Sequence, residues 1–429
     1  MSLLQSVQLA LQPYRQAKAW YLALSGGLDS SVLLHILAQL RKAEPLPPLT
    51  AIHVHHGLQK VADDWPAHCT QFCAALQVPL RLRSVRINQQ SNLEEAARRA
   101  RYEVFEQFLG PEDVLLTAQH QGDQAETLLF RLLRGAGVRG LAAMPRVRPL
   151  GQGRLVRPLI SIERAQLEAY ALKEGLTWVE DPTNQRLDFS RNYLRHFVLP
   201  ELQRRWPKVQ LSLARTAEHM AEAQGLLDEL ALQDLAGVRS KPEALAWLPL
   251  PSLALKPLAD LSEARQRNLL RYWLAPWTTL PDAAHWAGWI GVRDAASDRQ
   301  PFWRLAQGDV LRAEGHIWWL PHAWKKFSAA GLSSIKDLTE VQLLDNGVLQ
   351  VQGFAGDTNV RIGYRQGGER LKYSVQGSFE LKRLLNQSGI PAFVRPRLPL
   401  MFQGEEVVAV ANLWAPAGCN LRWQPPGLS

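Results

Sequence analysis

The sequence predicts an α/β protein. Its N-terminal domain has a doubly wound parallel sheet, and a helical middle domain and a small α+β C-terminal domain follow. Strand and helix signals alternate over the first 200 residues or so, which is typical of βαβ units. A long helical pattern and a tryptophan-rich section come next, and short strands with Gly/Pro turns end the chain. The 429 residues accommodate two to four domains at roughly 100–200 residues each.

Short apolar runs bounded by turn residues predict the strands of the first domain, at 20–24, 51–56, 80–85 and 113–120. Apolar residues at helical spacing predict the helices between them, at 31–40, 63–76, 93–109 and about 123–134. Because a helix separates each pair of successive strands, we expect parallel pairing with helices on both faces of the sheet.

The pattern changes after residue 180. Residues 191–207 read as a basic helical segment, and 209–235 as one long helix. Nine of the fifteen tryptophans lie between Trp247 and Trp324, and we interpret them as core rather than as platforms for bases. Residues 304–321 read as strands joined by turns, and 378–389 as a helix. The predicted domains are an N-terminal domain (1–208), a linker helix (209–240), a middle domain (241–330) and a C-terminal domain (345–429).

The charge distribution favours a polyanionic partner. Lys and Arg outnumber Asp and Glu by 49 to 40, and the window 131–157 holds seven arginines with no acid. A solvated protein face usually mixes both signs, so a segment of one sign indicates nucleic acid. A coding bias toward arginine is the alternative that composition leaves open.

Targeting and redox signals point to the cytoplasm. No stretch approaches the roughly 20 apolar residues that span a bilayer, and we expect no signal peptide and no membrane partner. The three cysteines, Cys69, Cys73 and Cys419, cannot form a disulfide framework, and none are spaced as CxxC. A reducing compartment fits this usage best.

Residues 25–30, Ser-Gly-Gly-Leu-Asp-Ser, lie between the first strand and a helix start. Gly26 and Gly27 allow the backbone to approach a phosphate closely, and the first N–H groups of a helix attract anions. Ser25 and Ser30 add hydroxyl donors. Asp29 would repel bare phosphate, so it indicates a divalent cation or a positioning role. The segment is neither a Walker A loop nor GxGxxG, and a plain N-cap turn is the alternative.

This hexapeptide resembles the SGGxDS signature of the PP-loop, N-type ATP pyrophosphatase superfamily, which has a Rossmann-like fold. The resemblance implies cleavage of ATP between the α and β phosphates, with pyrophosphate bound by Ser25, Gly26, Gly27, Leu28, Asp29 and Ser30. It implies an adenylated substrate oxygen from which a nucleophile displaces AMP.

Further motifs are similar to those of the tRNA(Ile)-lysidine synthetase family and cover most of the chain, most weakly across 236–340. They are His53–Leu58 (HVHHGL), Glu94–Tyr102 (EEAARRARY), His120–Thr127 (HQGDQAET), Arg134–Gly137, Gly140-Leu141, Arg157–Leu159, Glu180–Asn184 with Arg191, Asn192 and Arg195, Gly367–Arg370 and Lys382–Leu385. Gly122 departs from the pattern, because many members have an acid there.

The family resemblance implies a tRNA-modifying ligase. Its partners would be ATP with Mg²⁺, tRNA(Ile) with a CAU anticodon, and free L-lysine. The resemblance is compatible with a homodimer but does not decide the oligomeric state. ATP would adenylate O2 of cytidine 34, and the lysine ε-amine would then attack C2 and displace AMP, giving lysidine.

Residue roles follow from the motif matches. Asp123 and Glu126, at i and i+3 on one helix face, are candidates to bind or deprotonate the lysine amine or to hold Mg²⁺. Asp29 is a catalytic candidate and the candidate Mg²⁺ ligand. Arg98 and Arg101 are candidates to neutralise the phosphates, with surface pairing to Glu94 and Glu95 as the alternative. His53 is assigned to the adenine pocket or to packing, in preference to a metal cluster.

Other residues are candidates for contact with tRNA. They are His120, Arg131, Arg134, Arg139, Arg191, Arg195, Lys382 and Arg383, and Arg395 and Arg397 of the last domain are worth testing beside them. His120 has two readings: it orients the acids, or it contacts the base.

Two other functions stay open from the sequence. A PP-loop tRNA thiolase of the 2-thiocytidine type needs a persulfide cysteine or an iron–sulfur cluster, and Cys69 and Cys73 read better as buried structural thiols. A non-catalytic tRNA-binding protein on the same fold is the third reading, and the intact loop with Asp123 and Glu126 argues against it. Pyrophosphate release that depends on lysine and on the wobble cytidine separates the three.

Overall fold

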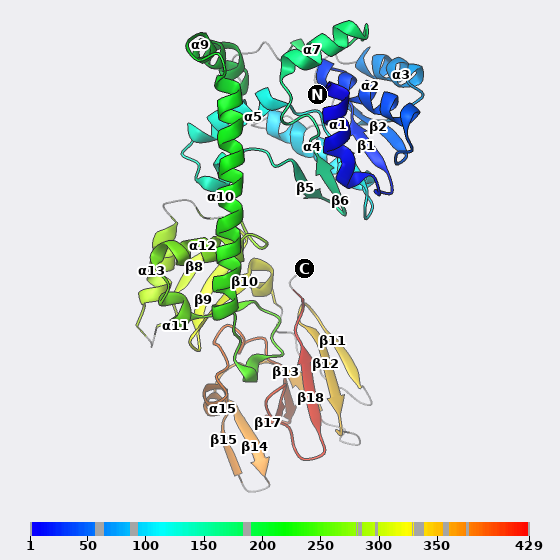
Figure 1. The fold of residues 1–429 in the computed structure, drawn as a ribbon. Helices are drawn as coiled ribbons and strands as arrows, with labels where there is room; N and C mark the ends of the chain where they lie inside the picture. The colour runs from blue at the N-terminus through cyan, green and yellow to red at the C-terminus, as the bar shows by residue number, and fades with distance from the viewer. Residues whose placement is uncertain are drawn as a thin grey trace. The chain divides into compact units, whose positions relative to one another are not determined.

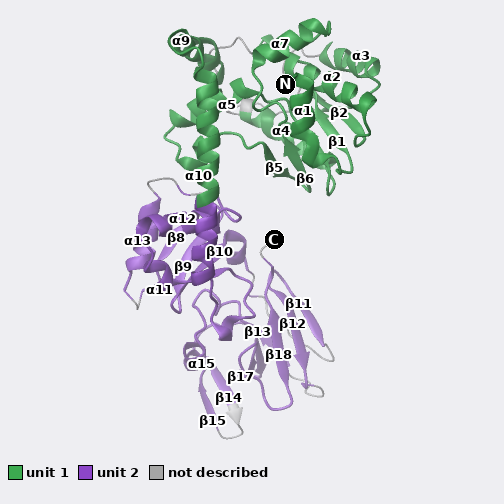
Figure 2. Ribbon diagram, viewed as in Figure 1, with its two compact units in different colours: residues 1–226 green, residues 227–429 purple. Residues whose placement is uncertain are grey.

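The computed structural model describes residues 2–55, 64–85, 93–182, 190–279, 281, 285–296, 299–327, 329, 339–354, 360–374 and 377–427. Two compact units make up the chain, residues 1–226 and 227–429 (Figure 2). Three motif positions of the sequence analysis lie outside the described residues: His56–Leu58, Thr183-Asn184 and the side chain of Glu94.

A six-stranded sheet lies at the centre of the first unit, in the order β3-β2-β1-β4-β6-β5 (Figure 1). Its strands are β1 (Trp20–Ala23), β2 (Leu49–His55), β3 (Leu80–Ser84), β4 (Val114–Leu116), β5 (Val147–Leu150) and β6 (Gly153–Val156). All neighbours are parallel except β5 and β6, which form an antiparallel hairpin. The predicted parallel sheet is confirmed, and the hairpin adds two strands that the sequence analysis did not predict.

Helices cover both faces of this sheet. The helices of this unit are α1 (Leu3–Leu11), α2 (Leu28–Ala43), α3 (Trp65–Ala75), α4 (Leu93–Phe108), α5 (Gln121–Leu132), α6 (Val138–Leu141), α7 (Arg164–Lys173), α8 (Ser190–Tyr193) and α9 (Leu199–Arg205), with a π-helical turn η4 (Leu194–Val198) between α8 and α9. Side chains of a strand alternate between faces. Trp20 and Leu22 of β1 therefore pack in the core with α2, whereas Tyr21 and Ala23 pack against Phe105 of α4.

The strand order places a binding site at the carboxyl ends of β1 and β4. The chain runs from β1 outward through β2 to β3 and then returns to the other side of β1 as β4. Doubly wound sheets bind ligands beyond the carboxyl ends of the strands at such a reversal. Residues 25–30 follow β1, and residues 117–123 follow β4, so the two predicted motifs meet there.

A 30-residue helix, α10 (Val209–Val238), follows α9 and covers the helix predicted over 209–235. Among the described residues, no helix has the length and apolarity to span a membrane.

The second unit begins with helices and a four-stranded antiparallel sheet in the order β7-β10-β9-β8. The elements are β7 (Ser252–Ala254), α11 (Leu255–Ala259), α12 (Glu263–Leu274), α13 (Trp286–Asp294), β8 (Phe302–Arg304), β9 (Gly308–Ala313), β10 (His316–Pro321) and α14 (His322–Lys325). Seven of the nine tryptophans in this section are buried, which confirms that they are core residues.

The C-terminal part holds two sheets, β11-β12-β18 and β13-β16-β17-β14-β15. The elements are β11 (Glu340–Leu343), β12 (Gly347–Gln352), β13 (Val360–Gly363), β14 (Arg370–Ser374), β15 (Gly377–Glu380), α15 (Leu381–Gln387), β16 (Leu400–Gln403), β17 (Glu406–Val410) and β18 (Asn420–Gln424). The helix predicted from residue 378 begins at Leu381, because the residues before it pair with β14.

Candidate active site

A cavity of about 430 Å³ opens in the first unit at the carboxyl ends of the strands. Ser25, Asp29 and Ser30 of the loop after β1 line it, together with His53 of β2. Asp123 and Glu126 of α5 also line this cavity, as do the predicted arginines Arg98, Arg101, Arg191 and Arg195. One cavity thus brings together ten predicted residues from five separate motifs.

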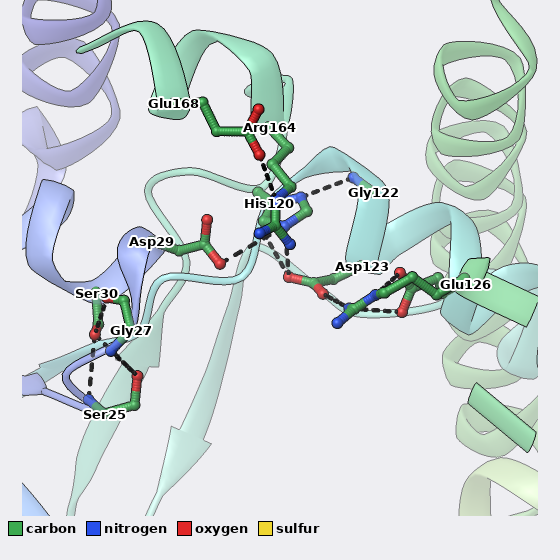
Figure 3. Close-up of polar contacts among 11 residues, drawn as sticks. Ser25, Gly27, Asp29, Ser30, His120, Gly122, Asp123, Glu126, Arg164 and Glu168 are labelled. Atoms are coloured by element: carbon green, nitrogen blue, oxygen red, sulfur yellow. Dashed lines mark hydrogen bonds and ion pairs between the residues drawn. The ribbon is translucent and has the colours of Figure 1, made fainter. Parts of the chain in front are cut away.

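The loop after β1 is held in a tight turn by its own serines (Figure 3). The Gly27 N–H donates to Ser25 Oγ at 3.2 Å, the two serine hydroxyls lie 2.9 Å apart, and Ser30 Oγ donates to the Gly27 carbonyl at 3.0 Å. Gly26 has φ +88°, and a Cβ there would meet Val179 Cγ2 at 3.0 Å. Since α2 begins at Leu28, the open first-turn N–H groups lie at the loop, as anion binding requires.

Asp29 is a half-buried carboxylate in the first turn of α2, with 29% of its side chain exposed. Burial raises its pKa, the nearby Asp123 adds to the rise, and His120, Arg164 and Arg195 oppose it. Its Oδ1 is buried and has no hydrogen-bond partner among the described residues. A buried carboxylate oxygen without a donor is costly, and a bound cation would remove that cost.

The donor set fits Mg²⁺. Asp29 and Asp123 lie on either side of His120, whose Nε2 is 3.9 Å from Asp29 Oδ2 and 3.7 Å from Asp123 Oδ2. Protein Mg²⁺ sites often use one or two carboxylates and complete the shell with substrate phosphates and water. Among the described residues, no group of three or more His, Cys, Asp or Glu side chains is placed to hold a metal ion by itself.

The two acids of α5 share an arginine partner. Arg195 Nε and Nη2 donate to Glu126 Oε1 and Oε2 at 2.6 and 2.9 Å, and Nη2 also donates to Asp123 Oδ1 at 3.0 Å. Burial raises the pKa of Glu126, and the Arg195 guanidinium opposes that rise. Arg195 was predicted from the sequence to contact tRNA. In the structure its guanidinium instead forms ion pairs with both acids.

His120 lies inside the protein, with 3% of its side chain exposed, and it forms the N-cap of α5. Its position between Asp29 and Asp123 favours the reading in which it orients the acids over direct contact with a base (Figure 3).

Arg98 and Arg101 of α4 line the cavity one turn apart. Tyr102, which closes the same motif, also lines it, and the guanidinium groups of Arg98 and Arg148 lie over its ring at 4.9 and 5.0 Å. Neither Tyr102 nor Arg148 was predicted to be a site residue. Tyr102 is the last residue of the motif at 94–102, and Arg148 belongs to the arginine window at 131–157, so the sequence contained a signal for each of them.

The remaining predicted tRNA contacts lie outside the cavity. Arg134 and Arg139 are exposed beside the C-terminal end of α5. Arg131, by contrast, is tied inward, because its Nη1 donates to the Gly140 and Ala143 carbonyls at 2.9 and 2.7 Å. Lys382 and Arg383 are exposed on α15 of the second unit.

Arg397 is a core residue of the second unit. It is 3% exposed, donates to Asn346 Oδ1 at 2.9 Å and lies over the Trp324 ring at 4.5 Å. Its guanidinium is therefore not available to a nucleic acid, in contrast to the test proposed from the sequence. Arg395 is half-buried and donates to the Ile390 carbonyl at 2.7 Å.

The thiols are unlike those of a sulfur carrier. Cys69 and Cys73 are buried on α3, and burial raises their pKa to about 12 and about 11. The thiolate is the reactive form, so these groups are unreactive near neutral pH. Cys419 is partly exposed in the second unit.

Three family models match the chain: a PP-loop domain over residues 2–202, a TilS substrate binding domain over 253–318 and a TilS substrate C-terminal domain over 360–424. The tRNA(Ile)-lysidine synthase of Pseudomonas syringae pv. tomato is 54% identical over 97% of this chain and 93% of its own. The protein of that name from Pseudomonas aeruginosa is 53% identical over 97% and 96%. The one from Coxiella burnetii is 40% identical over 94% and 93%.

Among solved structures, the U34-tRNA thiolase NcsA from Methanococcus maripaludis is 19% identical over 51% of this chain and 78% of its own, with a TM-score of 0.43. The full-length identities are far higher than this. With the loop, the acids and the arginines in one cavity, and relatives above 50% identity along almost the whole chain, the chain belongs to the tRNA(Ile)-lysidine synthase family.

Proposed function

We propose that this chain ligates free L-lysine to C2 of cytidine 34 in the CAU anticodon of tRNA(Ile). The product is lysidine, and the codon read changes from AUG to AUA. The observation that carries the proposal is the single cavity in which a nucleotide loop, two acids and several arginines face one another. The near full-length likeness to tRNA(Ile)-lysidine synthases supports the choice of substrates.

In the first step, O2 of the cytidine attacks the α-phosphorus of ATP, the α–β P–O bond breaks, and pyrophosphate leaves. The loop after β1 binds the departing pyrophosphate through Gly27 and the α2 N-terminus. Arg98 and Arg101 are far from the loop in sequence but line the same cavity. They neutralise the charge that develops on the phosphates.

In the second step, the lysine ε-amine attacks C2, the C2–O2 bond breaks, and AMP leaves with that oxygen. An ammonium group has no lone pair, so it must first lose a proton. Glu126 is the candidate acceptor, since burial raises its pKa toward a working range. Asp123 holds the ammonium beside it. For this, Arg195 must share the two acids with the incoming cation or give them up.

Mg²⁺ is the proposed cofactor beside ATP, held by Asp29. It would supply charge neutralisation on the phosphates. The buried, unpartnered Asp29 Oδ1 supports this assignment.

The proposed division of labour follows the predicted domains. Residues 1–208 carry catalysis, the helix over 209–240 links, and 241–330 with 345–429 bind the body of the tRNA; the two TilS-type matches support the last assignment. We place the reaction in the cytoplasm, where ATP, lysine and tRNA meet, in keeping with free thiols at all three cysteines. The resemblance also leaves a homodimer open, and light scattering decides that point.

The test is a reconstituted reaction with ATP, lysine and tRNA(Ile) transcript, followed by mass spectrometry of the digested nucleosides. We expect lysidine at position 34 and one pyrophosphate per lysidine. A transcript with uridine at position 34 is the matched control and should give neither product. Pyrophosphate release that is independent of lysine and of cytidine 34 contradicts the proposal.

A further inference from the structure

His120 lies where the two halves of the site meet. Asp29 belongs to the nucleotide loop after β1, and Asp123 belongs to α5 after β4. The His120 ring lies between them, with Nε2 at 3.9 Å from Asp29 Oδ2 and 3.7 Å from Asp123 Oδ2. The side chain is 3% exposed and does not line the cavity, so it acts on substrates only through these neighbours.

The other ring nitrogen fixes the orientation of the imidazole. His120 Nδ1 accepts the Gly122 N–H at 3.0 Å, and the Asp123 carboxylate in turn accepts the His120 backbone N–H at 3.0 Å. A nitrogen that accepts a hydrogen bond carries no proton, so the ring proton resides on Nε2. The N–H of Nε2 therefore faces the two carboxylates.

Gly122 makes this arrangement sterically accessible. A Cβ at position 122 would lie 2.8 Å from His120 Cε1 and 3.1 Å from Nδ1, so the ring would have to shift to make room for a side chain there. The glycine and the capping histidine are thus one local device of this chain.

We propose that His120 is a positioning residue. Its Nδ1 is anchored on the Gly122 amide, and its Nε2–H holds Asp29 and Asp123 at one spacing, which aligns the nucleotide loop with the acids of α5. At 3.9 and 3.7 Å the two contacts are longer than hydrogen bonds, and catalytic contacts of this kind often tighten only when substrates bind. This inference rests on the proposed function, in which both carboxylates work on the same reaction.

Two substitutions test the roles of the two His120 ring nitrogens separately. His120→Asn keeps an acceptor near the Nδ1 position and is a strong N-cap, but it is too short to reach Asp29. His120→Gln carries an N–H donor near the Nε2 position. For His120→Asn we expect kcat for pyrophosphate release to fall about 10- to 100-fold, as for other residues that orient ligating groups. The KM for ATP and the thermal midpoint should stay near wild type, and His120→Gln should recover a large part of the lost rate.

A double-mutant cycle adds an independent readout. Gly122→Ala should lower kcat as His120→Asn does, because its Cβ displaces the ring. In the Gly122→Ala/His120→Asn protein the alanine should cost nothing more, so the two losses are not additive. Ser262→Asn, which changes the N-cap of α12 in the second unit, is the matched control and should leave kcat unchanged.

Three results overturn the inference. His120→Asn with wild-type kcat removes the positioning role. Equal losses of kcat in His120→Asn and His120→Gln, with equal losses in thermal midpoint, reduce the residue to a structural cap. Fully additive losses for Gly122→Ala and His120→Asn separate the glycine from the histidine. A wild-type protein that forms no lysidine overturns the proposed function itself and is recognised before any variant is compared.

Discussion

Asp29 combines a functional position with a cost in stability. Because burial raises its pKa in the folded protein, the native state binds the proton more tightly than the unfolded chain. The Asp29 carboxyl therefore stabilises the folded state most when the pH is below its unfolded pKa. This stabilisation is lost as the pH rises through the folded pKa. With Mg²⁺ removed by chelation, we predict that Asp29→Asn has a higher thermal midpoint than wild type at neutral pH, and that the gap narrows as the pH falls through the folded pKa and closes near about pH 4.

Thermal melts across this pH range check the prediction, with pyrophosphate release measured in parallel. Asp260→Asn, an exposed acid paired with Lys256, is the control and should give no pH-dependent gap. An Asp29→Asn protein that melts below wild type at neutral pH would show that the carboxylate is compensated in the folded state. We expect the same variant to lose modification activity.

Asp123 should separate chemistry from binding. It lines the cavity, and its removal takes away the candidate ammonium partner while leaving the exposed arginines in place. We predict that Asp123→Ala lowers lysidine formation by at least about 100-fold, which is the scale of a lost acid–base group. Affinity for tRNA(Ile), measured by filter binding, should remain within about threefold of wild type. Lost tRNA binding with intact adenylation would reverse this assignment.

At the scale of elements, three of the four strands predicted in the first domain have a buried apolar run, and β3, which is mostly exposed, is the exception. β1, β2 and β4 qualify because helices cover both of their faces. The β5–β6 hairpin was not predicted, because VRPL and GRLV mix arginines with apolar residues and read as part of a basic surface. Both strands have only four residues, and β5, at the edge of the sheet, buries only Leu150, which leaves too few apolar positions for a clear signal.

The pairing of Arg195 with the acids is likewise beyond local sequence reasoning. Arg195 is 69 residues from Glu126 and 72 from Asp123, and only the packing of the segment α8–η4 beside α5 brings them together. The π-helical turn at 194–198 has no motif of its own, although such turns are frequent at functional sites. The acids themselves were predictable, since their i, i+3 spacing is local.

The C-terminal end of α5 offers a contrast between two arginines of the same window. Arg131 donates to two carbonyls of the 140–143 turn, whereas Arg134 is exposed with its guanidinium over Phe130. We predict that Arg134→Glu weakens tRNA binding and flattens its salt dependence by about one unit in log K against log salt. Arg131→Met should instead lower the thermal midpoint, because the Ala143 carbonyl loses its arginine donor and the Gly140 carbonyl keeps only the Ala143 N–H.

Binding isotherms at several salt concentrations and thermal melts of both variants provide the measurements. Arg204→Glu on α9, at a pair with Glu201 outside the arginine window, is the matched charge change. An unchanged salt slope for Arg134→Glu would remove this surface from the interface, and an unchanged midpoint for Arg131→Met would deny it the structural role.

At the scale of the whole molecule, basic residues must be sorted by burial before they are assigned to tRNA. Arg397 is enclosed by Asn346 and Trp324, so its charge stabilises the second unit. Lys382 and Arg383, on the exposed face of α15, have side chains that a phosphate can reach. The sequence gives all three the same weight, because burial is set by strands that are distant in the chain.

If both units bind one tRNA, their charge contributions should combine as independent terms. We predict that Lys382→Glu/Arg383→Glu weakens tRNA(Ile) binding, that Arg134→Glu does so separately, and that the triple variant loses the sum of the two free energies within about 0.5 kcal/mol. Each set should flatten the salt slope by its own amount. Arg397→Met should lower the thermal midpoint and leave the slope unchanged. If the α15 variant binds like wild type while Arg134→Glu does not, tRNA contact is confined to the first unit, and the second unit needs another explanation for its exposed basic helix.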